Sequence, residues 1–205
     1  MKKKINQCGI ATRAIVEGNI LVWLINIMVG GGSVWGLFLS GGGYVKDAGE
    51  ATFQAIYVQH EWWRLLTCGY LHIGVFHLLF NICALLVVVY RMEKQLGHFK
   101  IFLFYHFGIV ITALVWCMIF KNSAMVGASL VISVILGMKV IMGRLEISQQ
   151  EFRMTKRSRN YLIYYVLFGC LLGIETVAVH SIAFGVGVIF GGLYVGTKGV
   201  WSSYR

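Results

Sequence analysis

The sequence contains no proline and few charged residues. None of its 205 residues is proline, and only 13 per cent are Asp, Glu, Lys or Arg, about half the share found in an average soluble domain. Hydrophobic residues make up 58 per cent of the chain, and a soluble globule of this composition would expose apolar patches far beyond a few hundred Å². These features exclude a soluble enzyme, a secreted disulfide scaffold and a disordered tail. They favour a protein that crosses a membrane several times.

Cysteine is also sparse, and its spacing is uninformative. The five cysteines are scattered, without the CxxC or Cys–His spacing of a zinc site. Isolated cysteines in apolar runs usually act as small hydrophobic side chains. We therefore predict no disulfide framework, no metal site and no cofactor. Without proline, breaks between helices must depend on glycine, and the obvious flexible points are Gly30–Gly32 and Gly41–Gly43.

Six apolar runs qualify as membrane helices. About 20 apolar residues cross a hydrocarbon core of about 30 Å, and fewer suffice inside a close bundle. The runs cover residues 19–40, 70–90, 99–120, 125–143, 160–174 and 176–197. We predict an all-α membrane protein whose six helices form one domain over residues 19–197. A long loop at 44–69 joins the first two helices.

Lys and Arg are distributed unevenly between the two sides of this predicted bundle. The segments on the side of the amino terminus are 1–18, 91–100, 139–159 and 198–205. They hold 15 Lys and Arg, against three on the other side, so the positive-inside rule places both termini in the cytoplasm. The net charge of +10 then indicates orientation and affinity for anionic lipid, not nucleic-acid binding. We expect a multi-pass integral protein of a bacterial plasma membrane, with a basic amino-terminal segment and a short cytoplasmic tail.

Polar residues of three predicted helices fall at one depth. In the second helix His77 and Asn81 are four residues apart and share a face. The fourth helix opens near Ser129, and His180 lies about one turn into the sixth. All three helices begin outside, so these groups lie roughly 5–15 Å below the outer surface at 1.5 Å per residue. His72 is five residues before His77, and we expect it to point away from the pair.

Each of these residues also has a purely structural interpretation. Serine in a membrane helix usually bonds to the carbonyl one turn back, and a single His or Asn is often an interhelical hydrogen bond. After His180, however, Ala183, Gly187 and Gly191 are spaced by four. This small-residue stripe lets the sixth helix pack closely against a neighbour such as the fourth. That packing would bring His180 close to Ser129.

Ser129 and His180 together would supply the nucleophile and the base of acyl transfer. The only aspartate, Asp47, lies in the outer loop, so the membrane region can build at most a Ser–His dyad without a carboxylate. An oxyanion also needs fixed hydrogen-bond donors. His77, Asn81 and the N–H of Ser129, at the free start of a helix, can provide them.

Taken in order, these motifs resemble those of the rhomboid intramembrane serine proteases. They are Trp63-Arg64, His72-x4-His77-x3-Asn81, Glu93-x3-Gly97, Gly127-x-Ser129 and His180 with its small-residue stripe. The resemblance implies a six-helix bundle in which Ser129 is the nucleophile and His180 the general base and acid. It implies that His77, Asn81 and the Ser129 amide form the oxyanion hole, and that His72 is structural, beneath the long loop. The expected substrates are transmembrane proteins cut near the outer membrane face.

Three positions depart from the family pattern. Leu130 stands where glycine is common, Ser133 where an aromatic ring usually stacks on the catalytic histidine, and Ala183 where glycine is frequent. Because Ser129 and His180 are both present, we favour an active protease. The alternatives are an inactive rhomboid-like factor that binds membrane-protein clients and a small transporter, for which no paired acidic relay is visible.

Overall fold

The regular elements of the protein are helices. The computed structural model describes residues 9–29, 43–145 and 173–202, with 156, 159, 160, 163 and 164. The α-helices are α2 (Ile10–Val29), α4 (Tyr44–Gly49), α5 (Arg64–Thr67), α6 (Gly74–Ala84), α7 (Tyr90–Leu96), α8 (His98–Ile119), α9 (Ser129–Arg144) and α11 (Ile174–Ser202). Shorter π and 3-10 turns are η1 (Gln54–Val58), η2 (Cys68–Tyr70) and η3 (Leu85–Val89).

Four stretches of the described chain are long and apolar enough to cross a membrane. They are Ile10–Val29, Gly74–Leu96, His98–Ile119 and Ile174–Thr197. The prediction of an all-α membrane protein is therefore confirmed. The predicted fourth span corresponds to the 16-residue α9. Most of the predicted fifth span, 160–174, lies outside the described residues, so the count of six stays a prediction.

The start of α2 is set by a carboxylate far away in the sequence. The two oxygens of Glu93 accept hydrogen bonds from the N–H groups of Ala11 and Thr12, each at 2.9 Å, and satisfy donors that the start of a helix leaves free. Glu93 is buried and also bonds to Nδ1 of His98. A Cβ at Gly9 would overlap this carboxylate. α2 therefore begins at Ile10, before the predicted apolar run of 19–40, and the later part of that run lies outside the described residues.

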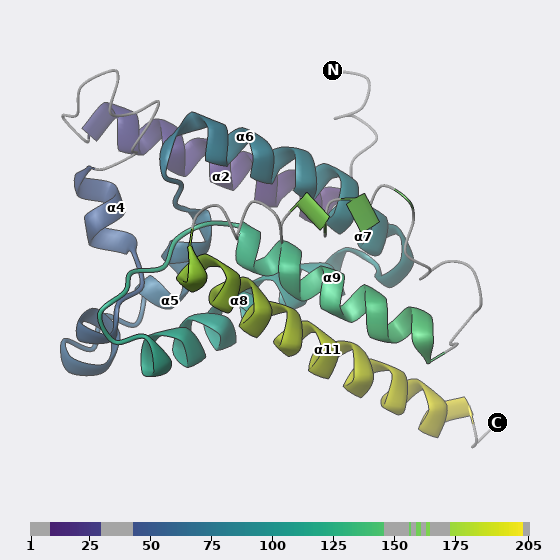
Figure 1. The fold of residues 1–205 in the computed structure, drawn as a ribbon. Helices are drawn as coiled ribbons and strands as arrows, with labels where there is room; N and C mark the ends of the chain where they lie inside the picture. Colours follow the sequence, from purple (N-terminus) through teal and green to yellow (C-terminus); the bar gives the residue numbers. More distant parts are fainter. Residues whose placement is uncertain are drawn as a thin grey trace.

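The long helices alternate in direction (Figure 1). α6, α9 and α11 all begin at one end of the bundle, whereas α2 and α8 run the opposite way. Gly97 separates α7 from α8 with a φ of +88°, a conformation that residues with a Cβ rarely adopt. We call the end at which α6, α9 and α11 begin the loop end, and the opposite end, where α7 and α9 finish, the basic end.

α9 lies in the middle of the bundle, with 12 of its 16 residues buried. A helix that is mainly apolar on every side suits this position. α11 packs on it so closely that a Cβ at Gly187 would lie 2.7 Å from the carbonyl carbon of Val134. A Cβ at Gly191 would lie 3.0 Å from Cα of Met138. The predicted packing of the small-residue stripe against the fourth helix is confirmed.

Residues 43–73 form a layer of short helices at the loop end, which we call the loop layer. Arg64 holds this layer together. Its Nη1 donates to the carbonyls of Asp47 at 2.6 Å and Glu50 at 3.2 Å, and its Nε pairs with the Glu61 carboxylate at 2.5 Å. These contacts tie the layer to its own backbone, while Ile56 and Leu65 anchor it in the hydrophobic core.

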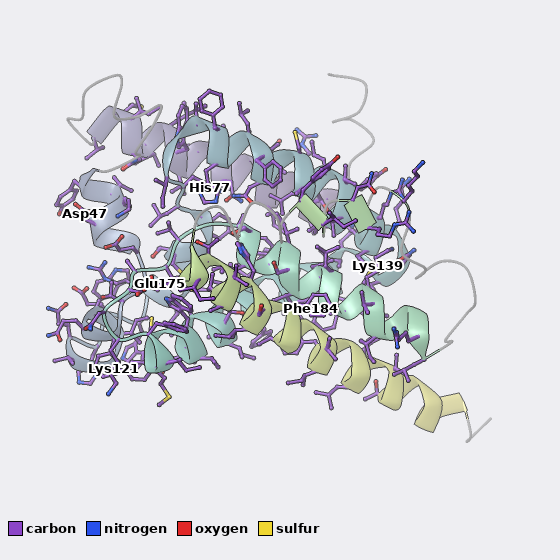
Figure 2. All side chains as sticks on the ribbon, viewed as in Figure 1. Asp47, His77, Lys121, Lys139, Glu175 and Phe184 are labelled. Atoms are coloured by element: carbon purple, nitrogen blue, oxygen red, sulfur yellow. The ribbon has the colours of Figure 1, made fainter. Side chains whose placement is uncertain are left out.

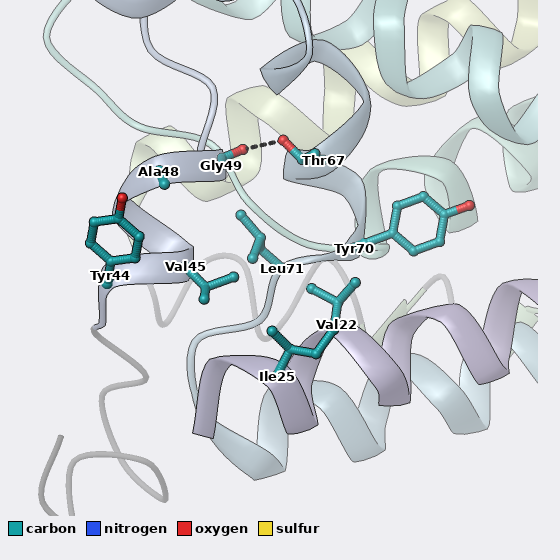
Figure 3. A pocket seen from close by; sticks show the side chains of 9 residues that line it. All are labelled: Val22, Ile25, Tyr44, Val45, Ala48, Gly49, Thr67, Tyr70 and Leu71. Carbon is teal, nitrogen blue, oxygen red and sulfur yellow. Dashed lines mark hydrogen bonds between the residues drawn. The ribbon is translucent and has the colours of Figure 1, made fainter. Parts of the chain in front are cut away.

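An apolar cavity of about 320 Å³ separates part of the loop layer from α2 (Figure 3). Val22 and Ile25 of α2 line it on one side, and Val45 of α4 lines it on the other. In the lining of the cavity, Oγ1 of Thr67 donates to the carbonyl of Gly49 at 2.8 Å. This bond ties the end of α4 to α5 rather than to the membrane helix.

Candidate active site

Ser129 is the first residue of α9 and is only 6 % exposed. Gly127 turns the chain into the helix with a φ of +118°, and its N–H donates to the carbonyl of Cys68 at 2.8 Å. Two residues earlier, Met125 and Ala51 exchange both backbone hydrogen bonds. The turn before Ser129 is therefore held at two points by the backbone of the loop layer.

His77 of α6 lies directly against this turn, toward the loop end of the bundle (Figure 2). A Cβ at Gly127 would lie 3.1 Å from Nε2 of His77 and 3.4 Å from Oγ of Ser129. Only glycine leaves that space open. The two functional atoms therefore border one small gap.

The backbone also orients the His77 ring. The N–H of Ile73 donates to Nδ1 of His77 at 3.3 Å. Nδ1 is then the acceptor nitrogen, so a neutral ring carries its hydrogen on Nε2. Nε2 is the nitrogen that borders the gap beside Ser129. His77 can therefore donate a hydrogen bond into that gap.

Asn81 is buried one turn after His77 in α6. Both residues lie within one regular helix, so the predicted shared face is confirmed. Asn81 lies on the same face of α6 as His77, one turn further from the loop end.

We expected His72 to point away from His77, and this prediction was wrong. The centroids of the two rings are 5.0 Å apart, with the rings edge to face. The expectation treated both residues as parts of one helix, but α6 begins only at Gly74, where φ is +83°. His72 belongs to the turn before the helix, and its Nδ1 meets the carbonyl of Tyr70 at 3.3 Å. It is buried and packs against the ring of His77.

His180 lies in the second turn of α11. The contact of Gly187 with Val134 sets the register of α11 on α9. Five residues earlier on each helix, the same register places Ile182 at the level of Ser129, and His180 lies two residues nearer the loop end. The fold therefore brings the start of α9 and the second turn of α11 to one depth.

Two neighbours define the surroundings of His180. It lies close enough to His77 for the two rings to interact electrostatically. Its own ring faces the backbone of Thr176, one turn earlier in α11. Residues from three separate helices, α6, α9 and α11, thus converge at the loop end.

The two departures after Ser129 are both buried in α9. Leu130 belongs to the hydrophobic core. Oγ of Ser133 donates to the carbonyl of Ser129 at 3.1 Å, the arrangement that serines in membrane helices commonly adopt. The hydroxyl of Ser133 is therefore bonded within α9 itself.

The remaining motif residues lie away from this site. Arg64 and Trp63 belong to the loop layer, where Nε1 of Trp63 donates to the carbonyl of Ala48 at 3.4 Å. Glu93 and Gly97 lie at the basic end. These four residues shape the scaffold that positions the site.

The structure also shows contacts that sequence reasoning missed. The carbonyl of Cys68, the N–H of Ile73 and the bridge from Ala51 are backbone groups, for which no side-chain pattern exists. Burial raises the pKa of the Cys68 thiol, so this cysteine does not provide a reactive thiolate beside Ser129. Among the described residues, no three His, Cys, Asp or Glu side chains come together as metal ligands.

Comparison with known proteins places this architecture in a family. The Rhomboid domain family model matches residues 59–199. "RHOMBOID-like protein 7" of Arabidopsis thaliana is 28 % identical over 152 residues, which cover 74 % of this chain and 47 % of that protein. "Rhomboid protease GluP" of Bacillus subtilis (strain 168) is 39 % identical over 75 residues, which cover 37 % and 15 %. "Inactive RHOMBOID-like protein 8" of Arabidopsis thaliana is 32 % identical over 78 residues, which cover 38 % and 22 %.

These matches span about half or less of the length of the relatives. The family match runs from the loop layer to α11 and so contains His72, His77, Asn81, Ser129 and His180. The chain belongs to the rhomboid family.

Proposed function

We propose that this chain is an intramembrane serine protease that cleaves transmembrane proteins by a Ser129–His180 dyad. The observation that carries the proposal is the gap at Gly127, bordered by Oγ of Ser129 and by Nε2 of His77. A nucleophile and a donor thus border a space that only glycine leaves open, and the proposed base, His180 of α11, lies near their level.

The reaction follows from the roles of these groups. Oγ of Ser129 attacks the scissile carbonyl carbon while its proton passes to His180. The tetrahedral intermediate collapses, the C–N bond breaks, and His180 returns the proton to the leaving amine. Water, activated by the same histidine, then releases the acyl group from Ser129.

The oxyanion of the intermediate needs donors that are already in place. We assign this role to Nε2 of His77, the side chain of Asn81 and the N–H of Ser129. The N–H of Gly127 is already bonded to Cys68, so it does not belong to the oxyanion hole. His77→Ala and Asn81→Ala should each lower kcat by about 10²–10³.

The substrate must expose its backbone at this site. A regular helix has no free scissile carbonyl, because its carbonyls are already hydrogen-bonded. We therefore expect cleavage where a transmembrane segment is weakened by small or helix-breaking residues. The shallow position of the site in the predicted orientation gives water access from the outer face.

An inactive role is the second candidate. The similarity to a relative named inactive favours it, as do Leu130 and Ser133, two of the three departures from the family pattern. In that case the same bundle would bind membrane-protein clients without cutting them. Such a protein would keep the packing of α9 on α11 but would not need the hydroxyl of Ser129.

Covalent labelling separates the two candidates without knowledge of the substrate. A fluorophosphonate probe should modify Ser129 in the purified protein, with the site identified by mass spectrometry. Labelling and cleavage of a model transmembrane substrate should both fall by about 10³ or more in Ser129→Ala and His180→Ala. Ser181→Ala, next to His180 but bonded to its own helix backbone, is the matched control. A folded wild-type protein that neither labels nor cleaves would favour the inactive role.

The proposed orientation has both termini in the cytoplasm. After replacement of the native cysteines, a cysteine at Thr52 in the loop layer should react with an impermeant thiol reagent from outside, and one at Arg144 should not. The reverse pattern would place the site at the wrong membrane face. The candidate spans support an integral membrane protein, and relatives that are mainly plant proteins do not support the bacterial plasma membrane.

A further inference from the structure

Two neighbouring polar residues of α8 bond to the loop layer, and the proposed reaction uses neither of them. Tyr105 is fully buried, and its hydroxyl donates to the carbonyl of Gly69 at 3.3 Å while it accepts from Nδ2 of Asn19 at 3.4 Å. The next residue, His106, meets the hydroxyl of Tyr70 with its Nε2 at 2.8 Å. Gly69 and Tyr70 both belong to η2. Because α8 is a candidate membrane span, polar side chains inside it point to a function.

The direction of the second hydrogen bond follows from the histidine ring. Nδ1 of His106 lies 2.8 Å from the carbonyl oxygen of Phe102, and a carbonyl can only accept. Nδ1 therefore carries the hydrogen of a neutral ring, and Nε2 accepts from the hydroxyl of Tyr70. Both nitrogens of the ring are engaged, so this side chain holds Tyr70 in one orientation.

Close packing also limits the movement of η2. A Cβ at Gly69 would overlap the side chain of Ile109 in α8. The ring of Tyr70 also lies against α2, where a Cβ at Gly18 would be 3.1 Å from Cε1 of the ring. η2 thus contacts two membrane helices, and the hydrogen bonds from α8 set its position on them.

The first residue of η2 holds the turn before the nucleophile. The carbonyl of Cys68 accepts from the N–H of Gly127 at 2.8 Å, so a displacement of η2 on α8 would reach Gly127 through a single hydrogen bond. We infer that Tyr105 and His106 are positioning residues for Ser129, which act through η2 on the turn at Gly127. This inference rests on the proposed function, since it assigns a purpose to the position of the nucleophile.

Removal of a single hydroxyl tests this role. Tyr105→Phe keeps the ring in the core and removes the hydrogen bond to η2. At saturating fluorophosphonate, the rate of Ser129 modification should fall about tenfold, because a small displacement of a reacting group can cost up to about 10²-fold. The probe concentration that gives the half-maximal rate should change little, since the groups that contact the probe are unchanged. Hydrogen exchange at the amides of residues 125–129 should accelerate.

The matched control is Tyr57→Phe, which removes the same kind of bond between the same two regions. The hydroxyl of Tyr57, in the loop layer, donates to the carbonyl of Leu114 in α8 at 3.1 Å, but Tyr57 does not belong to η2. Both variants should lower the midpoint of thermal unfolding to a similar extent, and only Tyr105→Phe should slow labelling. Unchanged labelling and exchange in Tyr105→Phe would overturn the inference, as would equal slowing in the two variants.

A conservative variant tests the histidine. His106→Gln keeps an acceptor for the Tyr70 hydroxyl in its amide oxygen, whereas His106→Leu removes it. Labelling should stay near the wild-type rate in the first variant and fall about fivefold in the second. Equal rates in the two would overturn the assignment of His106.

Failure of the proposed function would be visible separately. A wild-type protein that does not label would contradict the protease, and hydrogen exchange alone would then decide the inference. Faster exchange at residues 125–129 in Tyr105→Phe than in Tyr57→Phe would support the positioning of the turn, and equal exchange would overturn it.

Discussion

Two regions hold the site, and they do so by different physical means. One is the contact between α9 and α11, and the other is the loop layer. α11 lies on α9 with backbone against backbone, since Gly187 leaves no room for a Cβ beside Val134. The loop layer instead reaches the site through hydrogen bonds: the carbonyl of Cys68 accepts from the N–H of Gly127, and Ala51 and Met125 bond to each other in both directions. The first contact is close packing of two helices, whereas the contact of the loop layer with the turn before Ser129 consists of main-chain hydrogen bonds.

This difference separates what each region controls. The helix contact sets the register of two side chains, because sliding α11 by one turn would move His180 away from Ser129. The loop layer sets the path of the backbone before Ser129 and so keeps the gap at Gly127 open. Changes to the helix contact should therefore affect the whole bundle, whereas changes in the loop layer should act locally.

The largest effect should come from adding one methyl group between the helices. Gly187→Ala places its Cβ against the Val134 carbonyl, which cannot move aside without separating α9 from α11. Overpacking of this kind costs about 3 kcal/mol at its upper end, and Ser129 should lose its fluorophosphonate labelling. Thermal unfolding in detergent measures the first effect. Gly192→Ala, where no atom lies within 4 Å, should change neither quantity, and an equal loss in both variants would contradict this account of the register.

The hydrogen bonds of Glu93 at the basic end test whether the loss of polar contacts acts only locally. Glu93→Gln replaces the carboxylate that bonds to Ala11, Thr12 and His98. Loss of hydrogen bonds to a charged group costs about 2 kcal/mol, and hydrogen exchange at the first turn of α2 should accelerate. Glu17→Gln, in an exposed ion pair with Arg13, should leave exchange there nearly unchanged. Equal exchange rates in the two variants would show that Glu93 does not set the start of α2.

The loop layer should respond more weakly and without global unfolding. Arg64→Ala removes the contacts to Asp47, Glu50 and Glu61, at a cost of about 1.5 kcal/mol. Limited proteolysis between residues 43 and 63 should become faster while the α9–α11 pair stays protected. Arg64→Lys should show an intermediate rate, because it keeps the charge but not the planar fork. Faster proteolysis throughout the bundle would mean that the two regions are not separate units.

The smallest effect is expected at Ser133. Ser133→Ala removes only the hydroxyl bond to the carbonyl of Ser129, worth about 0.6 kcal/mol in membrane helices. Labelling of Ser129 should stay within twofold of the wild type. A tenfold loss would show that Ser133 positions His180, which by family resemblance it faces.

Several parts of the fold and site were predictable because they depend on side chains with a regular spacing. The pair His77 and Asn81 lies on one helix as its spacing indicates. The small-residue stripe of α11 packs against α9, because only small side chains let the two backbones come so close. His72 was misjudged for the opposite reason. The periodicity of a helix was extended past its start, and only the break at Gly74 shows that His72 folds back onto His77.

By itself, the sequence determined that the protein is helical and inserted in a membrane, and that Ser129 and His180 lie near the starts of two helices that pack together. Apolar composition decides that the helices enter a membrane, and the spacing of small residues decides which helix faces pack together. Both are properties of the side chains along one helix. Only the tertiary structure decided where α2 begins, how Gly127 is held, and which nitrogen of His77 faces Ser129. Those features depend on backbone carbonyls and N–H groups from distant segments, and every residue type carries a carbonyl.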